Sequence, residues 1–505
     1  MKENEAIFNA GVTEHKKTNR PVVLAAIMMA MFTGAIEATI VATAMPSIVG
    51  DLGGFSLFTW VFSAFLLTQA VTVPLYGKLA DLFGRKPVFV FGVVVFLIGS
   101  VLCGFAQTMY ALILFRLIQG IGAGAILPIA STIVGDIYSL EERAKVQGYI
   151  ASVWGISSII GPALGAVFVQ YFHWAWVFWV NIPLGVASIA GIWFFLHENV
   201  KTKQHNIDFL GAALLLVGVS ALMIVSIQGG STWPWRSKPV FFFLGIVLIS
   251  LVLFIIREKR AAEPIMPMAI WNNRLIALAN VCAFTTGVVM IGVATFLPTF
   301  IQGVMGLTPA VAGFTLAMMS IGWPLAATVA GRIMIKFGFR IIALVGGVAL
   351  VAGAIFFVTL QPEKGPLWAA AGAFLVGAGM GLTATTFIVA IQSSVEWTMR
   401  GAATASHMFM RILGNTVGAA ALGGVLNNYL NRFLQSQSES TNIPLDLDIA
   451  NSLLDPHKRS GLTETAVSTL RQGLAEALNI VYWGVLAVAL LSVLFIYYLP
   501  KKEEQ

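Results

Sequence analysis

A carboxylate and a guanidinium stand inside apolar stretches of this sequence. Glu37 lies in "TGAIEATIVATAMP" (residues 33–46), within an apolar run that begins near Val22, and Arg116 lies in a second apolar run. Charged side chains in such surroundings are rare and usually functional. Burial and a neighbouring guanidinium act in opposite directions on the proton affinity of a carboxylate, so a pocket that balances them lets a carboxylate gain and lose a proton. Glu37 and Arg116 are therefore candidates for a proton-coupling pair, and a permanent structural salt bridge is the alternative.

A second pair of such residues lies in "SHMFMRILGNTVG". His407 and Arg411 are four residues apart, and Gly414 and Gly418 continue the helix face that they share. An arginine near the middle of an apolar span seeks a carboxylate, a backbone carbonyl or a bound anion. His407 either relays protons or reaches toward the nearer end of the span. We include both residues among the candidates for proton coupling.

The elements that must hold these residues are long apolar helices. The chain has 505 residues, of which 58% are hydrophobic and 10% charged, with a mean hydropathy of +0.86. A soluble domain carries about 25% charged residues. Fourteen segments, from 22–45 to 402–426 and 478–499, each approach the ~20 residues that cross a bilayer. We therefore expect an all-α membrane protein. Cys103 and Cys282 both lie in apolar segments, so neither a disulfide framework nor a metal site is expected.

Lysine and arginine residues gather on one side of these segments. If the N-terminus is cytoplasmic, most of the 30 Lys and Arg residues fall in inner segments, as the positive-inside rule requires. The even number of spans then places both termini in the cytoplasm. The net charge of +7 therefore reflects topology, and no nucleic-acid partner is expected.

The expected spans divide the chain into five parts. These are a cytoplasmic tail (1–20), a first six-helix half (21–200), two inserted transmembrane helices with linkers (201–262), a second six-helix half (263–500) and a second tail (501–505). The second half contains a long outer loop, 427–479, in which "ETAVSTLRQGLAEAL" has helical spacing and predicts a surface helix. Either a solvated connector or a gating or binding role fits this loop.

Two sequence echoes relate the halves to each other. "GKLADLFGRK" (77–86) follows the second span and "GRIMIKFGFR" (331–340) follows the tenth, while "EERAKVQG" and "WTMRGAATA" precede the fifth and thirteenth spans. If the seventh and eighth spans are an insertion, these echoes align two six-span halves. Parallel repeats of this kind are typical of transporters whose substrate site lies near the middle of the membrane, between the halves.

The sequence resembles the major facilitator superfamily and, within it, the fourteen-span drug:proton antiporters. "GKLADLFGRK" is similar to the loop motif of the superfamily, "RLIQGIGAG" (116–124) to its fourth-span motif, and "GISSIIGPALG" (155–165) to its fifth-span antiporter motif. "WAWVFWVNIPLG" (174–185) and "EATIVATAMP" resemble elements of the fourteen-span branch. The second copy of the loop motif departs from the pattern, because Ile335 stands where Asp81 stands in the first.

This resemblance implies roles for two groups of residues. The loop motif implies a latch that holds the outward-facing state, and ordinary inner-surface charge with a turn is the alternative; its residues are Gly77, Asp81, Gly84, Arg85 and Lys86. The fifth-span motif implies a pliable helix that prevents leakage during exchange, and plain helix packing is the alternative; its residues are Gly155, Gly161, Pro162 and Gly165.

The expected substrate pocket is apolar, because the chain is rich in Phe and Met, with 35 and 18 residues. Candidate lining residues are Met28, Gln119, Met290, Phe296, Met318, Phe387 and Phe409. No second carboxylate is found at mid-membrane depth, which leaves neutral, monocationic and anionic substrates open.

The resemblance implies a secondary transporter that exports lipophilic, amphipathic molecules in exchange for protons by alternating access. The alternative is a dedicated transporter of one metabolite or organic anion. No phosphate-cradling G-x-x-x-x-G-K-[ST] loop is present in the sequence, which argues against an ATP-driven pump. A membrane enzyme and a non-transporting receptor are further rivals. We expect no cofactor and no metal, with the proton gradient as energy source, in a monomer in the lipid bilayer of a cell membrane, most simply a bacterial one.

Overall fold

The computed structural model describes residues 18–53, 57–198, 208–229, 233–261, 263–441 and 463–500. Within these ranges the chain is helical, and no strand is formed apart from an isolated bridge between Gly229 and Trp233. Fourteen of the described helices are long and apolar enough to cross a membrane. The expected all-α membrane protein with fourteen spans is therefore confirmed.

The first half consists of six spans. Polar side chains cap the N-termini of several of these helices. The side chains of Asn19 and Thr108 each accept a hydrogen bond from a backbone N–H of the first turn, and Ser139 forms a capping box with Glu142. The helices are α2 (Arg20–Leu52), α3 (Phe58–Phe83), α4 (Arg85–Gly104), α5 (Met109–Ile137), α6 (Leu140–Tyr171), the short α7 (Trp176–Trp179) and α8 (Asn181–Phe195).

The second half repeats this plan. The turn between α3 and α4 is made by Gly84 with φ 94°, and the turn between the corresponding helices of the second half by Gly338 with φ 82°. Both are left-handed conformations that glycine adopts without strain, which explains the glycine shared by the two loop motifs. The helices are α12 (Arg274–Thr299), its π-helical extension η2 (Phe300–Val304), α13 (Pro309–Phe337), α14 (Phe339–Val358), α15 (Gly365–Ser393), α16 (Arg400–Thr441) and α19 (Glu464–Tyr497), with short 3-10 turns η3 (Pro362–Lys364) and η4 (Trp397–Met399).

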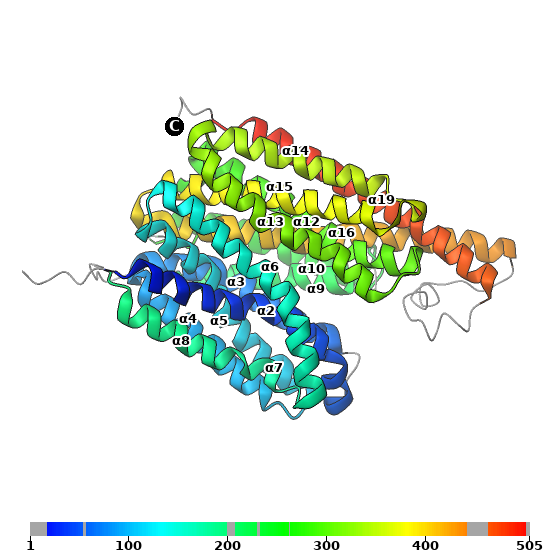
Figure 1. Cartoon of the computed structure of the whole chain (residues 1–505), viewed down its shortest axis with the longest axis horizontal. Helices are drawn as coiled ribbons and strands as arrows, with labels where there is room; N and C mark the ends of the chain where they lie inside the picture. The colour runs from blue at the N-terminus through cyan, green and yellow to red at the C-terminus, as the bar shows by residue number, and fades with distance from the viewer. Residues whose placement is uncertain are drawn as a thin grey trace, which may run out of the picture.

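The two halves lie side by side in Figure 1, the first in blue and cyan and the second in green, yellow and red. Helices α3 and α6 contact α16 and α13 across the boundary between them. The inserted helices α9 (Phe209–Gln228) and α10 (Lys238–Arg260) pack on each other, and α9 touches both α3 and α16. The short α11 (Met268–Asn272) then leads into α12. The inserted pair of helices therefore contacts both halves.

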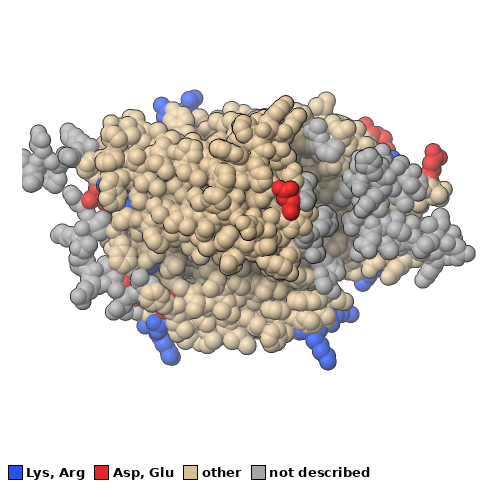
Figure 2. Space-filling view, turned by 90° about the horizontal axis from the view of Figure 1, so that it is seen from below, with Lys and Arg blue, Asp and Glu red and all other residues tan. Residues whose placement is uncertain are grey.

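The first residue of α2 and the last of α19 lie at the same end of the bundle (Figure 1). We call this the inner end, since the distribution of basic residues predicts that it faces the cytoplasm. The face of the molecule in Figure 2 is formed mainly by uncharged residues over most of its length. Exposed aromatic and aliphatic side chains on α4, α8 and α10, such as Phe91, Phe194 and Phe242, suit contact with lipid.

At the outer end, helical structure extends further than the sequence suggests. Residues 427–441 and 464–479, expected in a long loop, continue α16 and begin α19. The segment expected to form a separate surface helix is therefore the start of the last span. Leu430, Leu434, Leu470 and Leu474 are buried between the two helices, which protrude beyond the rest of the bundle in Figure 1. This burial stabilises helices whose other faces are polar.

Candidate functional site

Glu37 lies in the core of the first half, in direct contact with Arg116. One carboxylate oxygen is 2.5 Å from Arg116 Nη1, and the other accepts a hydrogen bond of 2.8 Å from Asn181 Nδ2. Glu37 and Asn181 are 0% exposed and Arg116 is 1% exposed. The two residues that the sequence suggests as a pair are therefore in contact, and these bonds join α2, α5 and the start of α8.

Further polar groups hold the arginine in place. Arg116 Nη1 also donates to Gln119 Oε1 at 2.7 Å, Arg116 Nε donates to the carbonyl of Val61 at 3.1 Å, and the Phe65 ring lies 4.3 Å from the guanidinium carbon. Gln119 in turn donates to Ser100 Oγ at 2.9 Å. One carboxylate and one guanidinium thus share a closed polar network. Such a buried pair is stable only while its members stay paired.

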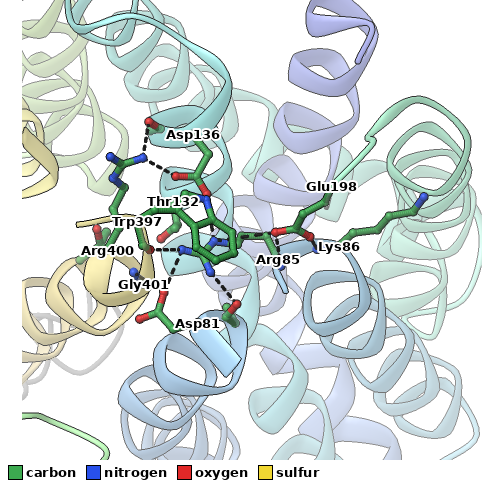
Figure 3. A network of polar contacts seen from close by, with 12 residues as sticks. Asp81, Arg85, Lys86, Thr132, Asp136, Glu198, Trp397, Arg400 and Gly401 are labelled. Atoms are coloured by element: carbon green, nitrogen blue, oxygen red, sulfur yellow. Dashed lines mark hydrogen bonds and ion pairs between the residues drawn. The ribbon is translucent and has the colours of Figure 1, made fainter. Parts of the chain in front are cut away.

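The loop-motif residues form a second polar network at the inner end, shown in Figure 3. Asp81 accepts hydrogen bonds from the backbone nitrogens of Gly401 at 2.9 Å and Ala402 at 2.7 Å, and it forms an ion pair of 2.9 Å with Arg85. The two backbone donors belong to the first turn of α16, where helix N–H groups have no partner within the helix. Asp81 of the first half therefore caps a helix of the second half.

Arg85 and Asp136 extend this contact between the halves. Arg85 Nε lies 2.9 Å from Asp136 and Arg85 Nη2 donates to the carbonyl of Trp397 at 2.7 Å, while its guanidinium lies 3.8 Å from the Trp397 ring centroid. Arg400 Nη1 lies 2.5 Å from the other oxygen of Asp136. Asp136 thus bridges an arginine of each half (Figure 3). We call these residues, Asp81, Arg85, Asp136, Trp397 and Arg400, the inner gate, for the role that we propose for them below.

Glu198 supports the inner gate from the end of the first half. Its two oxygens accept from the backbone nitrogens of Arg85 at 2.9 Å and Lys86 at 3.0 Å, which caps the start of α4. Lys86 makes no ion pair with Asp81; its ammonium donates to the carbonyl of Leu196 at 3.0 Å. Gly77 packs directly against Gly401 and Ala405 of α16, where a side chain would collide.

Sequence reasoning missed several of these partners. The sequence predicted no role for Asp136 or Glu198. A signal existed for three others: Trp397 and Arg400 lie in the "WTMRGAATA" echo, and Asn181 lies in "WAWVFWVNIPLG". The partner of the Asn181 amide, Glu37, lies in a helix distant in sequence, so the sequence alone does not reveal the pair.

The fifth-span glycines line both sides of α6. A Cβ at Gly155 would lie 2.9 Å from the carbonyl oxygen of Ser320 in α13, and one at Gly165 would lie 3.0 Å from that of Ile40 in α2. A Cβ at Gly161 would collide with Thr39 of α2. Pro162 lies in the same helix, and its side chain is outside the described residues. Helix α6 thus packs closely against α2 of its own half and α13 of the other.

His407 and Arg411 lie apart from the Glu37 network, in the second half. His407 is 2% exposed and packs edge-on against the Phe387 ring at 6.0 Å, so it does not reach the inner interface. Arg411 is half-buried, with its guanidinium 5.8 Å from the centroid of Trp323. The structure therefore separates the four candidate proton-coupling residues into two pairs.

The candidate substrate-lining residues do not gather in one place. Gln119 belongs to the Glu37 network. Met28 packs on the core of the first half, Phe387 of α15 shares a cluster with residues of α12 and α16, and Phe409 shares one with residues of α9 and α10. Three others belong to the core of the second half: Met290, Phe296 and Met318. Among the described residues, no three His, Cys, Asp or Glu side chains are grouped as metal ligands would be.

Comparison with known proteins agrees with this architecture. The sequence profile of the Major Facilitator Superfamily matches residues 27–419. Multidrug transporter protein MdtP of Bacillus subtilis is 37% identical over 414 residues, which are 82% of this chain and 76% of the relative. Multidrug resistance protein 3 of the same organism is 33% identical over 495 residues, 97% of each chain.

Solved structures with the same fold are more distant in sequence. The human organic anion transporter MFSD10 aligns with a TM-score of 0.63 at 14% identity, over 95% of this chain and 100% of that one. The proton:xylose symporter XylE aligns with a TM-score of 0.60 at 12% identity, over 95% of both chains. The chain therefore belongs to the major facilitator superfamily, and it is a multi-pass membrane transporter of small molecules, not an enzyme.

Proposed function

We propose that this protein exports lipophilic, amphipathic drug-like molecules across the cell membrane in exchange for protons, by alternating access and as a monomer. The observation that carries the proposal is the Glu37 network, in which a fully buried carboxylate is held by Arg116 and Asn181. The names of the two B. subtilis relatives, both multidrug proteins, support drug-like molecules as the substrate class.

The inner gate supports the alternating-access part of this proposal. Its residues close the inner end by joining α3, α4 and α5 to the start of α16 (Figure 3). Opening this end requires these bonds to break, so the inner gate stabilises the state that is closed to the cytoplasm. Transport then depends on a balance between inner-gate bonds and the contacts that form when the inner end opens.

Glu37 supplies the coupling in this scheme. A carboxylate that is 0% exposed exchanges no proton with water while its network is intact. Rearrangement of the halves separates Glu37 from Arg116 or admits water, and the carboxylate then binds or releases a proton according to the side that is open. The alternative, a permanent structural salt bridge, predicts that the charge of Glu37 has no part in coupling transport to the proton gradient.

Transport by purified full-length protein in liposomes tests this. A fluorescent lipophilic probe is followed under an imposed pH gradient, with and without an ionophore that collapses it, for wild type, Glu37→Gln and Glu363→Gln. The last variant makes the same change at an exposed outer position. We expect gradient-dependent flux in wild type and Glu363→Gln, and its loss in Glu37→Gln. Gradient-dependent flux that survives in Glu37→Gln would refute the role of Glu37.

A further inference from the structure

Arg411 is a cation at mid-membrane depth with no acidic partner in the segments that the structure describes. It lies 11 residues into α16, ~16 Å from the start of the helix at ~1.5 Å per residue. Among the residues that the structure describes it forms no salt bridge, and its close partner is the Trp323 ring. The buried arginines of the first half differ, because Arg116 meets Glu37 and Arg85 meets Asp81 and Asp136. An unneutralised guanidinium at this depth is unfavourable and needs a reason.

Some buried polar atoms of the second half also lack hydrogen-bond partners in the described structure. They are His407 Nδ1, Asn280 Oδ1, Thr386 Oγ1 and Asn415 Oδ1. His407 is 2% exposed, and Asn280 and Thr386 are 0% exposed. Buried polar groups are nearly always paired in folded proteins. The helices α12, α15 and α16 therefore hold unused hydrogen-bonding capacity on the same half of the molecule as the unpaired charge.

The Arg411 and Trp323 side chains suit one kind of ligand. A guanidinium presents a planar fork of donors that matches the two oxygens of a carboxylate or the oxygens of a sulfonate. The indole beside it offers an apolar face on which an aromatic ring can stack. Both side chains are half-buried, so each keeps some accessible surface.

We propose that Arg411 binds the acidic group of a transported molecule while Trp323 packs against its aromatic part, so that amphipathic aromatic anions are among the substrates. This inference rests on the transport function proposed above and specifies a substrate class for it. The substrate anion neutralises the half-buried cation, for which the described part of the chain supplies no acidic partner. Arg411 then acts as a binding residue for substrate and not as a carrier of the coupling proton.

Equilibrium binding tests the inference without any proton gradient. The probes are pyrene butyrate, its neutral amide and the corresponding pyrene trimethylammonium cation, measured by fluorescence anisotropy with full-length protein in detergent. The variants are Arg411→Gln, Arg411→Lys and, as matched control, Arg432→Gln, which removes an exposed arginine of the same helix. We expect wild type and Arg432→Gln to bind the anion at least about tenfold more tightly than the amide.

In Arg411→Gln we expect this ratio to fall to about one, with binding of the amide unchanged, and in Arg411→Lys we expect part of the preference to remain. An unchanged ratio in Arg411→Gln, or an equal loss for all three probes, would overturn the inference, the latter by showing a structural role. Failure of gradient-driven flux with an intact anion preference would count against proton exchange but support this site. Absence of the anion preference in wild type, with gradient-driven flux of the cation intact, would count against this site but support proton exchange.

Discussion

The inner gate makes a quantitative prediction at Asp81. The two hydrogen bonds from Gly401 and Ala402 cross between the halves, whereas the ion pair with Arg85 lies within the first half. Asp81→Asn keeps one acceptor oxygen, so it removes one charge-assisted bond, about 1.5–3 kcal/mol. It also removes the interaction of a negative charge with the start of α16, about 1 kcal/mol. Closure of the inner end should therefore weaken by about 3 kcal/mol, roughly a 150-fold shift in population.

Cysteine labelling measures this shift. Thr404 is 1% exposed behind the inner gate, so Thr404→Cys is introduced after Cys103 and Cys282 are replaced by serine. The rate of reaction with a membrane-impermeant maleimide, added from the inner side, reports the open population. We expect Asp81→Asn to raise the rate by roughly 100-fold, and Asp51→Asn, a matched change at the exposed outer end, to leave it unchanged. An equal rate in the Asp81 and Asp51 variants would refute the assignment of Asp81 to the inner gate.

Three further changes test other contacts. Trp397→Ala removes the ring that lies 3.8 Å from Arg85 and should raise the same labelling rate by roughly 10-fold; no change would remove the ring from the inner gate. Gly161→Ala forces a methyl group against Thr39 and should lower the free energy of unfolding in detergent by about 1–3 kcal/mol. Combination with Thr39→Ala should restore part of this stability, and full stability of the single variant would contradict the close packing. Arg116→Lys keeps the charge but cannot satisfy all of its acceptors, so gradient-driven flux should be lost; wild-type flux would show that charge alone suffices.

The number and order of the spans could be predicted because apolar segments of about 20 residues are a strong signal. The helical outer end of α16 could not, since its polar face gives it the composition of a loop, and the helix at 464–478 was predicted as a surface helix and not as the start of the last span. The helical state of both segments depends on contacts between Leu430 and Leu474 and their neighbours, which bring together segments distant in sequence. Tertiary burial thus overrides local composition there.

The Glu37 network was partly predictable for a geometric reason. Counting residues from the ends of two oppositely directed helices places Glu37 and Arg116 at similar depth. Asn181 carried no such signal, because an amide near a helix start is unremarkable until its partner is known. Asp136 and Arg400 stand at helix ends, where charges ordinarily meet water. The two residues pair with each other because the two halves are in contact at this end, which the sequence alone does not show.

Proton release upon substrate binding tests the central claim most directly. Purified protein in a weakly buffered detergent solution is mixed with substrate, and a pH-sensitive dye records protons released at equilibrium, for wild type and Glu37→Gln. Exchange of substrate against a proton at Glu37 predicts release from wild type and none from the variant. Equal release from both proteins, or no release from a wild type that binds the substrate, would contradict the account.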